Sequence, residues 1–304
     1  MLKSSESYRA YFALFVAIIA VSTSAILVRL SNATPGIIAF YRLFFTVVLM
    51  LPLLPRYLKS FKSISVKVWV GCAVAGLSLA FHFILWFQSL ELTSVASSVV
   101  LVTLQPLFAF VGTVIFFKER YRFGAVIGAL LSILGSVIIS WGDFRLSSTA
   151  LVGDCLALAA CAVVTIYLMI GQQVRQTLQL YTYTFIVYSF SLITLFIYNL
   201  IVKAPFTGYS FNNWVWFVLL AALPTLLGHT LFNWTVKFVG VTTISMGILG
   251  EPIGASILAY FIFGETLRPM QIFGSLVILI GIGIYLSSGL LAKTKTKVTQ
   301  DVSS

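Results

Sequence analysis

The chain has 304 residues, of which 60% are hydrophobic and only 9% are charged, and its mean hydropathy is +1.05. About a quarter of the residues in a soluble domain are charged, so this composition excludes a water-soluble fold and predicts an integral membrane protein. The net charge of +11 does not indicate a nucleic-acid partner, because the basic residues are distributed in a pattern typical of membrane proteins.

Ten apolar segments of about 20 residues follow one another along the chain. Each can cross a hydrocarbon layer of about 30 Å as an α-helix that rises about 1.5 Å per residue. Their apolar runs are continuous and do not alternate, which favours helices over the strands of a membrane barrel. The predicted spans are residues 10–30, 36–55, 67–90, 93–117, 121–141, 150–171, 180–200, 214–236, 241–263 and 268–291.

The first segment follows the basic start "MLKSSESYR", but its apolar core is too long for a cleaved signal peptide, so we interpret it as a span. Of the 19 Lys and Arg residues, 14 fall on the side of the N-terminus, four fall on the other side, and Arg42 lies inside the second span. This bias predicts a multi-pass plasma-membrane protein with both termini in the cytoplasm. The polar tail, residues 292–304, is predicted to be disordered and to lie against anionic lipid.

Arg42, in "AFYRLFFTVV", is the only cation deep in the first half of the chain. An ionisable side chain in hydrocarbon costs roughly 2.5–3.5 kcal/mol on insertion scales, so it needs a partner or a function. Two interpretations stay open. Arg42 neutralises a carboxylate of a substrate or of the protein, or it snorkels to the nearer interface.

The only two histidines, His82 and His229, lie in the equivalent third and eighth spans. Trp86 and Asn233 follow them at i+4, which places each pair on one helical face. Imidazole, indole and amide groups around one cavity would suit a small zwitterion or an aromatic solute. The alternative is that both histidines are packing residues. Two histidines and a glutamate without local spacing do not predict a metal site.

The ninth span contains "ILGEPIG", where Glu251 and Pro252 interrupt an uncharged run. Glu251 lies near the midplane, so it must face a cavity or a partner, or be protonated. It is therefore a candidate for substrate binding and for proton coupling, with a packing role as the alternative. Proline cannot donate a backbone hydrogen bond, so Pro252 predicts a bend and a candidate hinge. "LQP" in the fourth span places Gln105 and Pro106 in the same arrangement.

The fourth and fifth spans repeat in the ninth and tenth at a constant offset of 146 residues. Each half has five spans, an odd number, so the second copy must enter the membrane inverted. Inverted repeats are the architecture of secondary transporters. The offset pairs Gln105 with Glu251, Pro106 with Pro252, Glu119 with Glu265, Arg122 with Arg268, Gly128 with Gly274 and Gly135 with Gly281.

Ten spans in two five-helix halves, with proline followed after about a dozen apolar residues by Lys-Glu or Gly-Glu and by glycine-spaced helices, resemble the EamA-type drug/metabolite transporter superfamily. The resemblance covers essentially the whole chain. It implies a carrier of small metabolites, often an exporter of amino acids or related compounds. The chain lacks the first-span glutamate of the four-helix multidrug exporters and the paired basic residues of phosphate-sugar carriers.

The sequence therefore predicts an all-α membrane protein with one five-helix repeat at 10–141 and an inverted one at 150–291. The expected function is secondary transport of small organic metabolites by alternating access, and the favoured direction is export. Whether transport is coupled to protons stays open. A facilitated uniporter or a drug or amine exporter is the nearest alternative. An intramembrane enzyme is the alternative from another class, but no catalytic constellation is positioned, so an enzyme is not predicted. No phosphate loop or cofactor motif is present, and the oligomeric state stays open.

Overall fold

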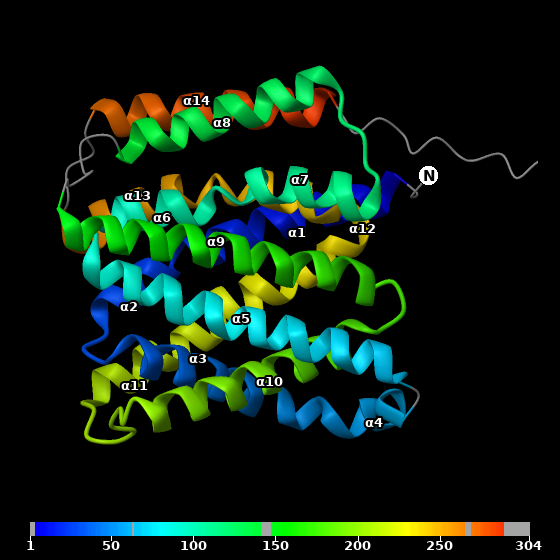
Figure 1. The fold of residues 1–304 in the computed structure, drawn as a ribbon, viewed down its shortest axis with the longest axis vertical. Coiled ribbons are helices and arrows are strands. Elements are labelled where there is room, and N and C mark those ends of the chain that lie inside the picture. Colours follow the sequence, from blue (N-terminus) through cyan, green and yellow to red (C-terminus); the bar gives the residue numbers. More distant parts are fainter. Residues whose placement is uncertain (1–3, 63, 141–146, 265–268, 289–304) are drawn as a thin grey trace, which may run out of the picture.

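A computed structural model describes residues 4–62, 64–140, 147–264 and 269–288, and these residues are almost entirely helical (Figure 1). The predicted tail at 292–304 lies outside the described residues, as do Glu265 and Arg268 of the repeat. The first half contains α1 (Ser4–Ser22), α2 (Ser24–Leu30), α3 (Pro35–Met50), a 3-10 turn (Leu51–Leu53), α4 (Leu54–Lys62), α5 (Val66–Leu92), α6 (Val95–Thr103), α7 (Gln105–Phe117) and α8 (Phe123–Ser140). The second half contains α9 (Ser148–Val174), α10 (Leu180–Ile201), α11 (Phe211–Leu220), the π-helix η2 (Ala221–His229), α12 (Thr230–Ile248), α13 (Glu251–Phe263) and α14 (Pro269–Ser288).

These elements form ten membrane crossings in two halves of opposite orientation. Eight helical runs in the described residues are long and apolar enough to cross a membrane, and the shorter apolar helices 123–138 and Glu251–Phe263 belong to the remaining crossings. The ninth crossing begins inside α12, where Gly240 has φ 80° and ψ 165°. A left-handed φ suits glycine, so the chain turns there, and residues 241–248 lead back into α13.

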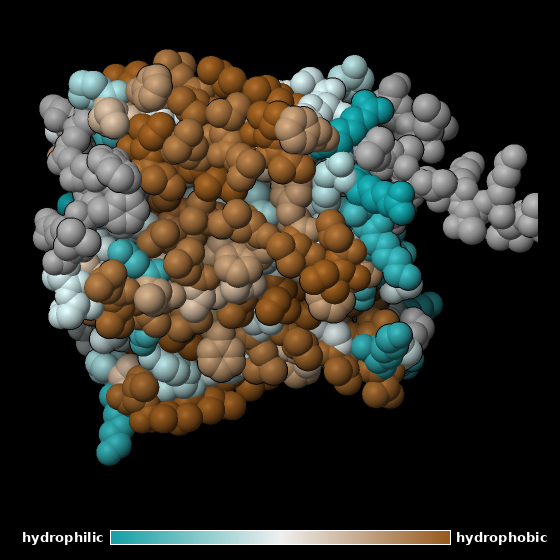
Figure 2. Space-filling view, turned by 45° about the horizontal axis from the view of Figure 1, so that its top comes forward, coloured by the Kyte–Doolittle hydropathy of each residue, from teal (hydrophilic) through white to brown (hydrophobic). Residues whose placement is uncertain are grey.

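The molecule has two ends that differ in charge. We call the end that carries the amino terminus, α4 and the loops 118–122 and 175–179 the basic end, and the other the opposite end (Figure 1). Hydrophobic side chains form a broad belt over the face between them, with hydrophilic groups gathered toward the ends (Figure 2). Such a belt is the surface that lipid requires.

Several crossings are broken near their middle. The proline pattern predicted bends in the fourth and ninth spans, and the structure has breaks at Leu104, between α6 and α7, and at Leu249–Gly250, between α12 and α13. The first span, predicted as one helix, is also interrupted at Thr23, between α1 and α2. The eighth span, also predicted as one regular helix, widens into η2 around Pro224. All of these breaks surround the centre of the bundle.

The helices α8 and α14 pack side by side at one edge of the bundle (Figure 1). Their glycines make the close approach possible. A Cβ at Gly128 would lie 2.6 Å from the carbonyl oxygen of Gly281, and a Cβ at Gly135 would lie 2.7 Å from that of Gly274. These are the glycines that the repeat relates, so the duplicated helices pack against each other.

Candidate functional site

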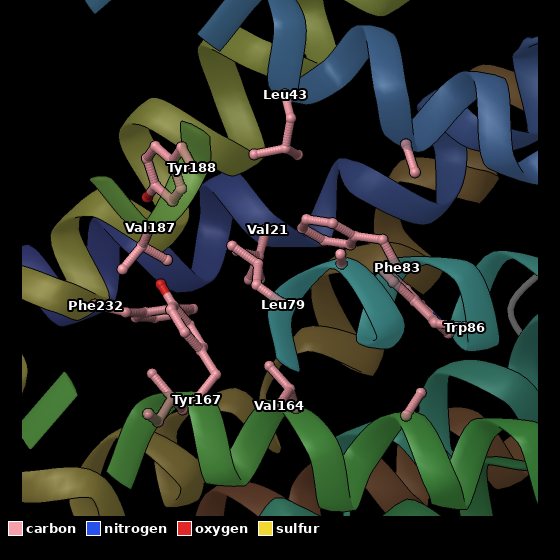
Figure 3. Close-up of a cluster of buried hydrophobic side chains, with 14 of the residues drawn as sticks. Val21, Leu43, Leu79, Phe83, Trp86, Val164, Tyr167, Val187, Tyr188 and Phe232 are labelled. Atoms are coloured by element: carbon pink, nitrogen blue, oxygen red, sulfur yellow. The ribbon is translucent and has the colours of Figure 1, made fainter. Parts of the chain in front are cut away.

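A small cavity lies at the centre of the bundle, where the broken helices meet. All of its lining residues are at most 8% exposed, so it is closed off from both ends. Apolar side chains from several helices, among them Val21, Phe83 and Phe232, converge around this region (Figure 3). The lining comprises Val21, Ser24, Arg42, His82, Trp86, Val102, Gln105, Val164, Leu168, His229, Phe232, Ile248 and Glu251.

Arg42 lies on α3 and is fully buried. Its Nε donates to Oγ1 of Thr225 at 2.7 Å, and its Nη1 donates to Oγ of Ser24 at 2.9 Å. The guanidinium also stacks over the ring of Phe83, 4.2 Å from the centroid. Arg42 therefore does not snorkel to an interface, because these contacts hold it at the cavity. Its Nη2 has no hydrogen-bond partner among the described residues and is available to a ligand.

Gln105 and Glu251 are the first residues of α7 and α13, and both line the cavity. A helix N-terminus carries roughly half a positive charge, so two half-helices direct positive ends toward the same space. Glu251 compensates this field in the second half, and it shares the cavity with Arg42. Gln105 is neutral, and its Oε1 accepts no hydrogen bond from the part of the chain that the structure describes. The cavity therefore offers one cation, one carboxylate and one amide.

The aromatic residues His82, Trp86 and His229 complete the polar lining. Nδ1 of His82 donates to the carbonyl of Ala160 at 3.0 Å, which leaves Nε2 as an acceptor. His82 stacks on Trp86 with 5.7 Å between ring centroids and lies 6.4 Å from His229. Nε1 of Trp86 and Nδ1 of His229 have no hydrogen-bond partner in the described ranges of the chain. A buried polar group without a partner costs about 1–3 kcal/mol, so these groups favour a polar ligand.

Asn233 is the one candidate substrate-binding residue that does not line the cavity. Its Nδ2 donates to the hydroxyl of Tyr167, which lies behind His229 with 6.2 Å between the two rings. The hydroxyl of the neighbouring Tyr188 lies 3.0 Å from that of Thr230. These residues form a second polar layer next to the cavity. The amide that faces the cavity itself is that of Gln105.

Sequence reasoning missed Ser24 and Thr225, the two hydroxyls that hold Arg42. Thr225 follows Pro224 within η2, and its hydroxyl also donates to the carbonyl of Leu220, five residues earlier. Ser24 follows the break at Thr23 in the run "STS". The sequence could have identified them as hydroxyl residues next to helix breaks, because a break frees backbone polar groups that need hydrogen-bond partners.

The cavity is narrow. It leaves about 30 Å³ for the centres of water-sized molecules. Since a water needs on the order of 10–15 Å³, the space suits two or three waters or a small polar group. An organic solute would need the helices around the cavity to move apart, so this is a closed arrangement of the site.

Comparisons with known proteins agree with this architecture. The EamA-like transporter family matches residues 8–141 and 151–287, one match to each half. The chain belongs to the EamA-like transporter family. It is therefore a multi-pass membrane protein of a transporter family, and the family points to transport.

Two relatives of this EamA-like transporter are themselves named as uncharacterized transporters. An uncharacterized transporter of Clostridium kluyveri is 24% identical over 233 residues, which is 75% of this chain and 74% of the relative. The uncharacterized transporter YdfC of Bacillus subtilis is 23% identical over 208 residues, 68% of this chain and 67% of the relative. One crystal structure has a TM-score of 0.75 with this chain at 20% sequence identity. The match covers 92% of this chain and 98% of the chain in that structure. This likeness shows the shared fold.

Proposed function

We propose that this EamA-like transporter is a secondary carrier of small zwitterionic metabolites, amino acids or close relatives, and that it works by alternating access in the direction of export. The observation that carries the proposal is the convergence of Arg42 and Glu251 on one closed cavity between inverted half-helices. A zwitterion presents the two complementary charges, a carboxylate and an ammonium.

The chemistry of the lining supports this substrate class. The free Nη2 of Arg42 and Nε1 of Trp86 are donors for a carboxylate, and the N-terminus of α7 adds a favourable field. The carboxylate of Glu251 and Oε1 of Gln105 are acceptors for an ammonium group. Apolar walls, among them Val164 and Phe232, are suited to a hydrocarbon side chain.

The experiment is flux in proteoliposomes that contain the full chain, tested with a panel of amino acids, amines and nucleobases, with and without a pH gradient. For an amino acid that moves, we compare its methyl ester, which lacks the carboxylate, and its N-acetyl form, which lacks the ammonium. We expect both to move at least tenfold more slowly, since each leaves one charged group of the cavity without its partner.

Arg42→Gln tests the carboxylate site directly, and Arg56→Gln, at an exposed position of α4, is the matched control. We expect amino-acid flux to fall roughly 30-fold or more in Arg42→Gln and to stay at the parent level in Arg56→Gln. Faster flux of the methyl ester than of the amino acid, insensitive to Arg42→Gln, would identify an amine exporter instead. An absence of flux for every solute would remove the proposal.

A further inference from the structure

The guanidinium of Arg42 is held by three helical elements other than its own. Its Nε donates to Oγ1 of Thr225 in η2 at 2.7 Å, and its Nη1 donates to Oγ of Ser24 in α2 at 2.9 Å. Its central carbon lies 4.2 Å from the ring centroid of Phe83 in α5. Nη2 is the nitrogen that has no hydrogen-bond partner among the described residues. A carboxylate in the cavity therefore finds Nη2 as an unused donor.

The hydroxyl of Thr225 has a fixed direction. Thr225 is fully buried, and it donates its hydroxyl hydrogen to the backbone carbonyl of Leu220 at 2.9 Å. A hydroxyl carries one hydrogen and two lone pairs, so the oxygen is left to accept the Nε–H of Arg42. Arginine has no acceptor of its own, so this hydrogen bond has only one possible direction. The orientation of the guanidinium thus depends on where the hydroxyl hydrogen of Thr225 goes.

Pro224 explains why the carbonyl of Leu220 is open to this hydroxyl. In an α-helix the residue at position 224 would donate its backbone N–H to the carbonyl of Leu220, and proline has no N–H. The chain widens at this proline into the π-helix η2. Pro224 and Thr225 therefore act in sequence, since the first leaves a carbonyl without its usual donor and the second supplies a hydroxyl to it.

Other buried threonines of this chain use their hydroxyls differently. Thr46 and Thr165 donate to the carbonyl four residues earlier, as threonine does in a regular helix. Thr225 and Thr230 donate to the carbonyl five residues earlier. The longer reach belongs to the wide turn of η2, and single π-helical turns are frequent at functional sites. The wide turn therefore sets the position of the oxygen that holds Arg42.

A fixed guanidinium limits how a solute can bind to it. Arginine frequently grips a carboxylate or a phosphate with two parallel N–H groups. The pair formed by Nε and Nη2 of Arg42 is not open to a solute, because Thr225 occupies Nε. The donor left over on Nη2 suits one carboxylate of a small molecule, at a position that the protein defines.

We propose that Thr225 and Pro224 are positioning residues for the carboxylate of the substrate. Thr225 orients the guanidinium of Arg42 so that Nη2 meets the solute. Pro224 acts through Thr225, because it leaves the carbonyl of Leu220 open to the hydroxyl. This role rests on the proposed function, in which Arg42 binds the carboxylate of a zwitterion.

The first test is concentration-dependent flux of the transported amino acid in proteoliposomes that contain the full chain. Thr225→Val removes the hydroxyl and keeps the shape of the side chain, whereas Thr225→Ser keeps the hydroxyl. Thr235→Val is the matched control, because Thr235 is a buried threonine of the same crossing whose hydroxyl donates to the carbonyl of Phe232 on its own helix.

We expect Thr225→Val to raise KM roughly tenfold with a smaller change in kcat, since a misdirected donor weakens binding of the solute. Thr225→Ser should stay within about threefold of the parent KM, since it retains the acceptor for Arg42. Thr235→Val should not move KM. The residual flux of the methyl ester, which lacks the carboxylate, should be the same in all of these variants.

Pro224→Ala tests whether the proline acts through the threonine. The new N–H competes with the hydroxyl of Thr225 for the carbonyl of Leu220, and we expect KM to rise roughly threefold. The double variant Pro224→Ala/Thr225→Val should have the KM of Thr225→Val alone, because the hydroxyl that the proline directs is gone. Effects that multiply in the double variant would remove the role of Pro224.

A second measurement does not depend on the substrate. Isotope-labelled arginine reports Nε–H groups by NMR in full-length protein in lipid nanodiscs, and the signal that is missing in Arg42→Gln identifies Arg42. We expect hydrogen exchange of this group with solvent to be at least tenfold faster in Thr225→Val. It should keep the parent rate in Thr225→Ser and in Thr235→Val.

A parent KM in Thr225→Val, or an equal loss of amino-acid and ester flux, would overturn the proposal even where every variant folds, because a purely structural role affects both solutes alike. Faster exchange without amino-acid flux would support the positioning of Arg42 by Thr225 and remove the proposed substrate. Amino-acid flux that depends on Arg42 and not on Thr225 would leave the proposed function standing and remove the positioning role.

Discussion

The two broken helices at the centre of the bundle share a backbone and differ in charge. Both breaks precede a proline, and both place the first residue of the following half-helix in the cavity. That residue is Gln105 in α7 and Glu251 in α13. Across the same repeat, Arg42 corresponds to Tyr188. The first half therefore supplies the cation of the site, and the second half supplies the carboxylate.

This difference indicates which features the repeat has retained. The break is set by the backbone, because proline lacks an N–H and both halves need an opening at the same depth. The charged side chains have diverged, because a single central cavity needs only one set of them. A carboxylate at the N-terminus of a half-helix is also stabilised by the helix dipole, by about 0.3–1 kcal/mol at exposed sites.

Glu251→Gln would place a glutamine at the start of both half-helices, and we expect it to have the largest effect on amino-acid flux. We expect at least a 100-fold loss of amino-acid flux, since the ammonium group loses its charged partner and Arg42 loses a compensating charge. Proteoliposome flux with and without a pH gradient measures it. Glu91→Gln, at the exposed end of α5, is the matched control and should behave as the parent.

The gradient separates the two roles of Glu251. Gradient-driven flux in the parent, with only gradient-independent exchange left in Glu251→Gln, would assign proton coupling to this carboxylate. Gradient-independent flux that is unchanged in the variant would make Glu251 a packing residue and the protein a uniporter. The double variant Gln105→Glu/Glu251→Gln places the carboxylate on the other break. Recovery of part of the flux in the double variant would show that the two positions face the same solute.

Packing against α1 also distinguishes the two half-helices. A Cβ at Gly254 of α13 would lie 2.3 Å from Oγ and 2.7 Å from Cβ of Ser22, whereas the equivalent residue of α7 is the exposed Phe108. We expect Gly254→Ala to cost about 1–3 kcal/mol of stability, because α1 and α13 must move apart. Phe108→Ala should cost well under half of that. Denaturant unfolding in detergent measures both, and equal costs would contradict the packing asymmetry.

Replacing either proline should have the smallest effect on the rate of flux. Pro106→Ala and Pro252→Ala each add an N–H at the start of a half-helix, where proline is already well accommodated. We expect roughly a threefold change in the rate of flux for either variant, of the same sign in both. If only one of the two variants changed the rate of flux tenfold or more, the break at that proline would be a hinge and the other break would not.

The positions of the membrane crossings, the inversion of the second half and the two proline breaks are determined by the sequence itself. Hydrocarbon leaves the backbone no partner except its own helix, so an apolar run of about 20 residues has essentially one solution. The inversion of the second half follows from the odd number of spans in each half, and the breaks follow from the missing N–H at Pro106 and Pro252.

The surroundings of the polar side chains were decided only by the tertiary structure. Arg42 left two interpretations open in the sequence, and its hydroxyl partner Thr225 lies 183 residues away. Asn233 lies one turn from His229, yet its amide turns to Tyr167 on α9. A hydrogen bond between helices depends on the distance and angle between two particular atoms, and a pattern along one chain does not contain that geometry.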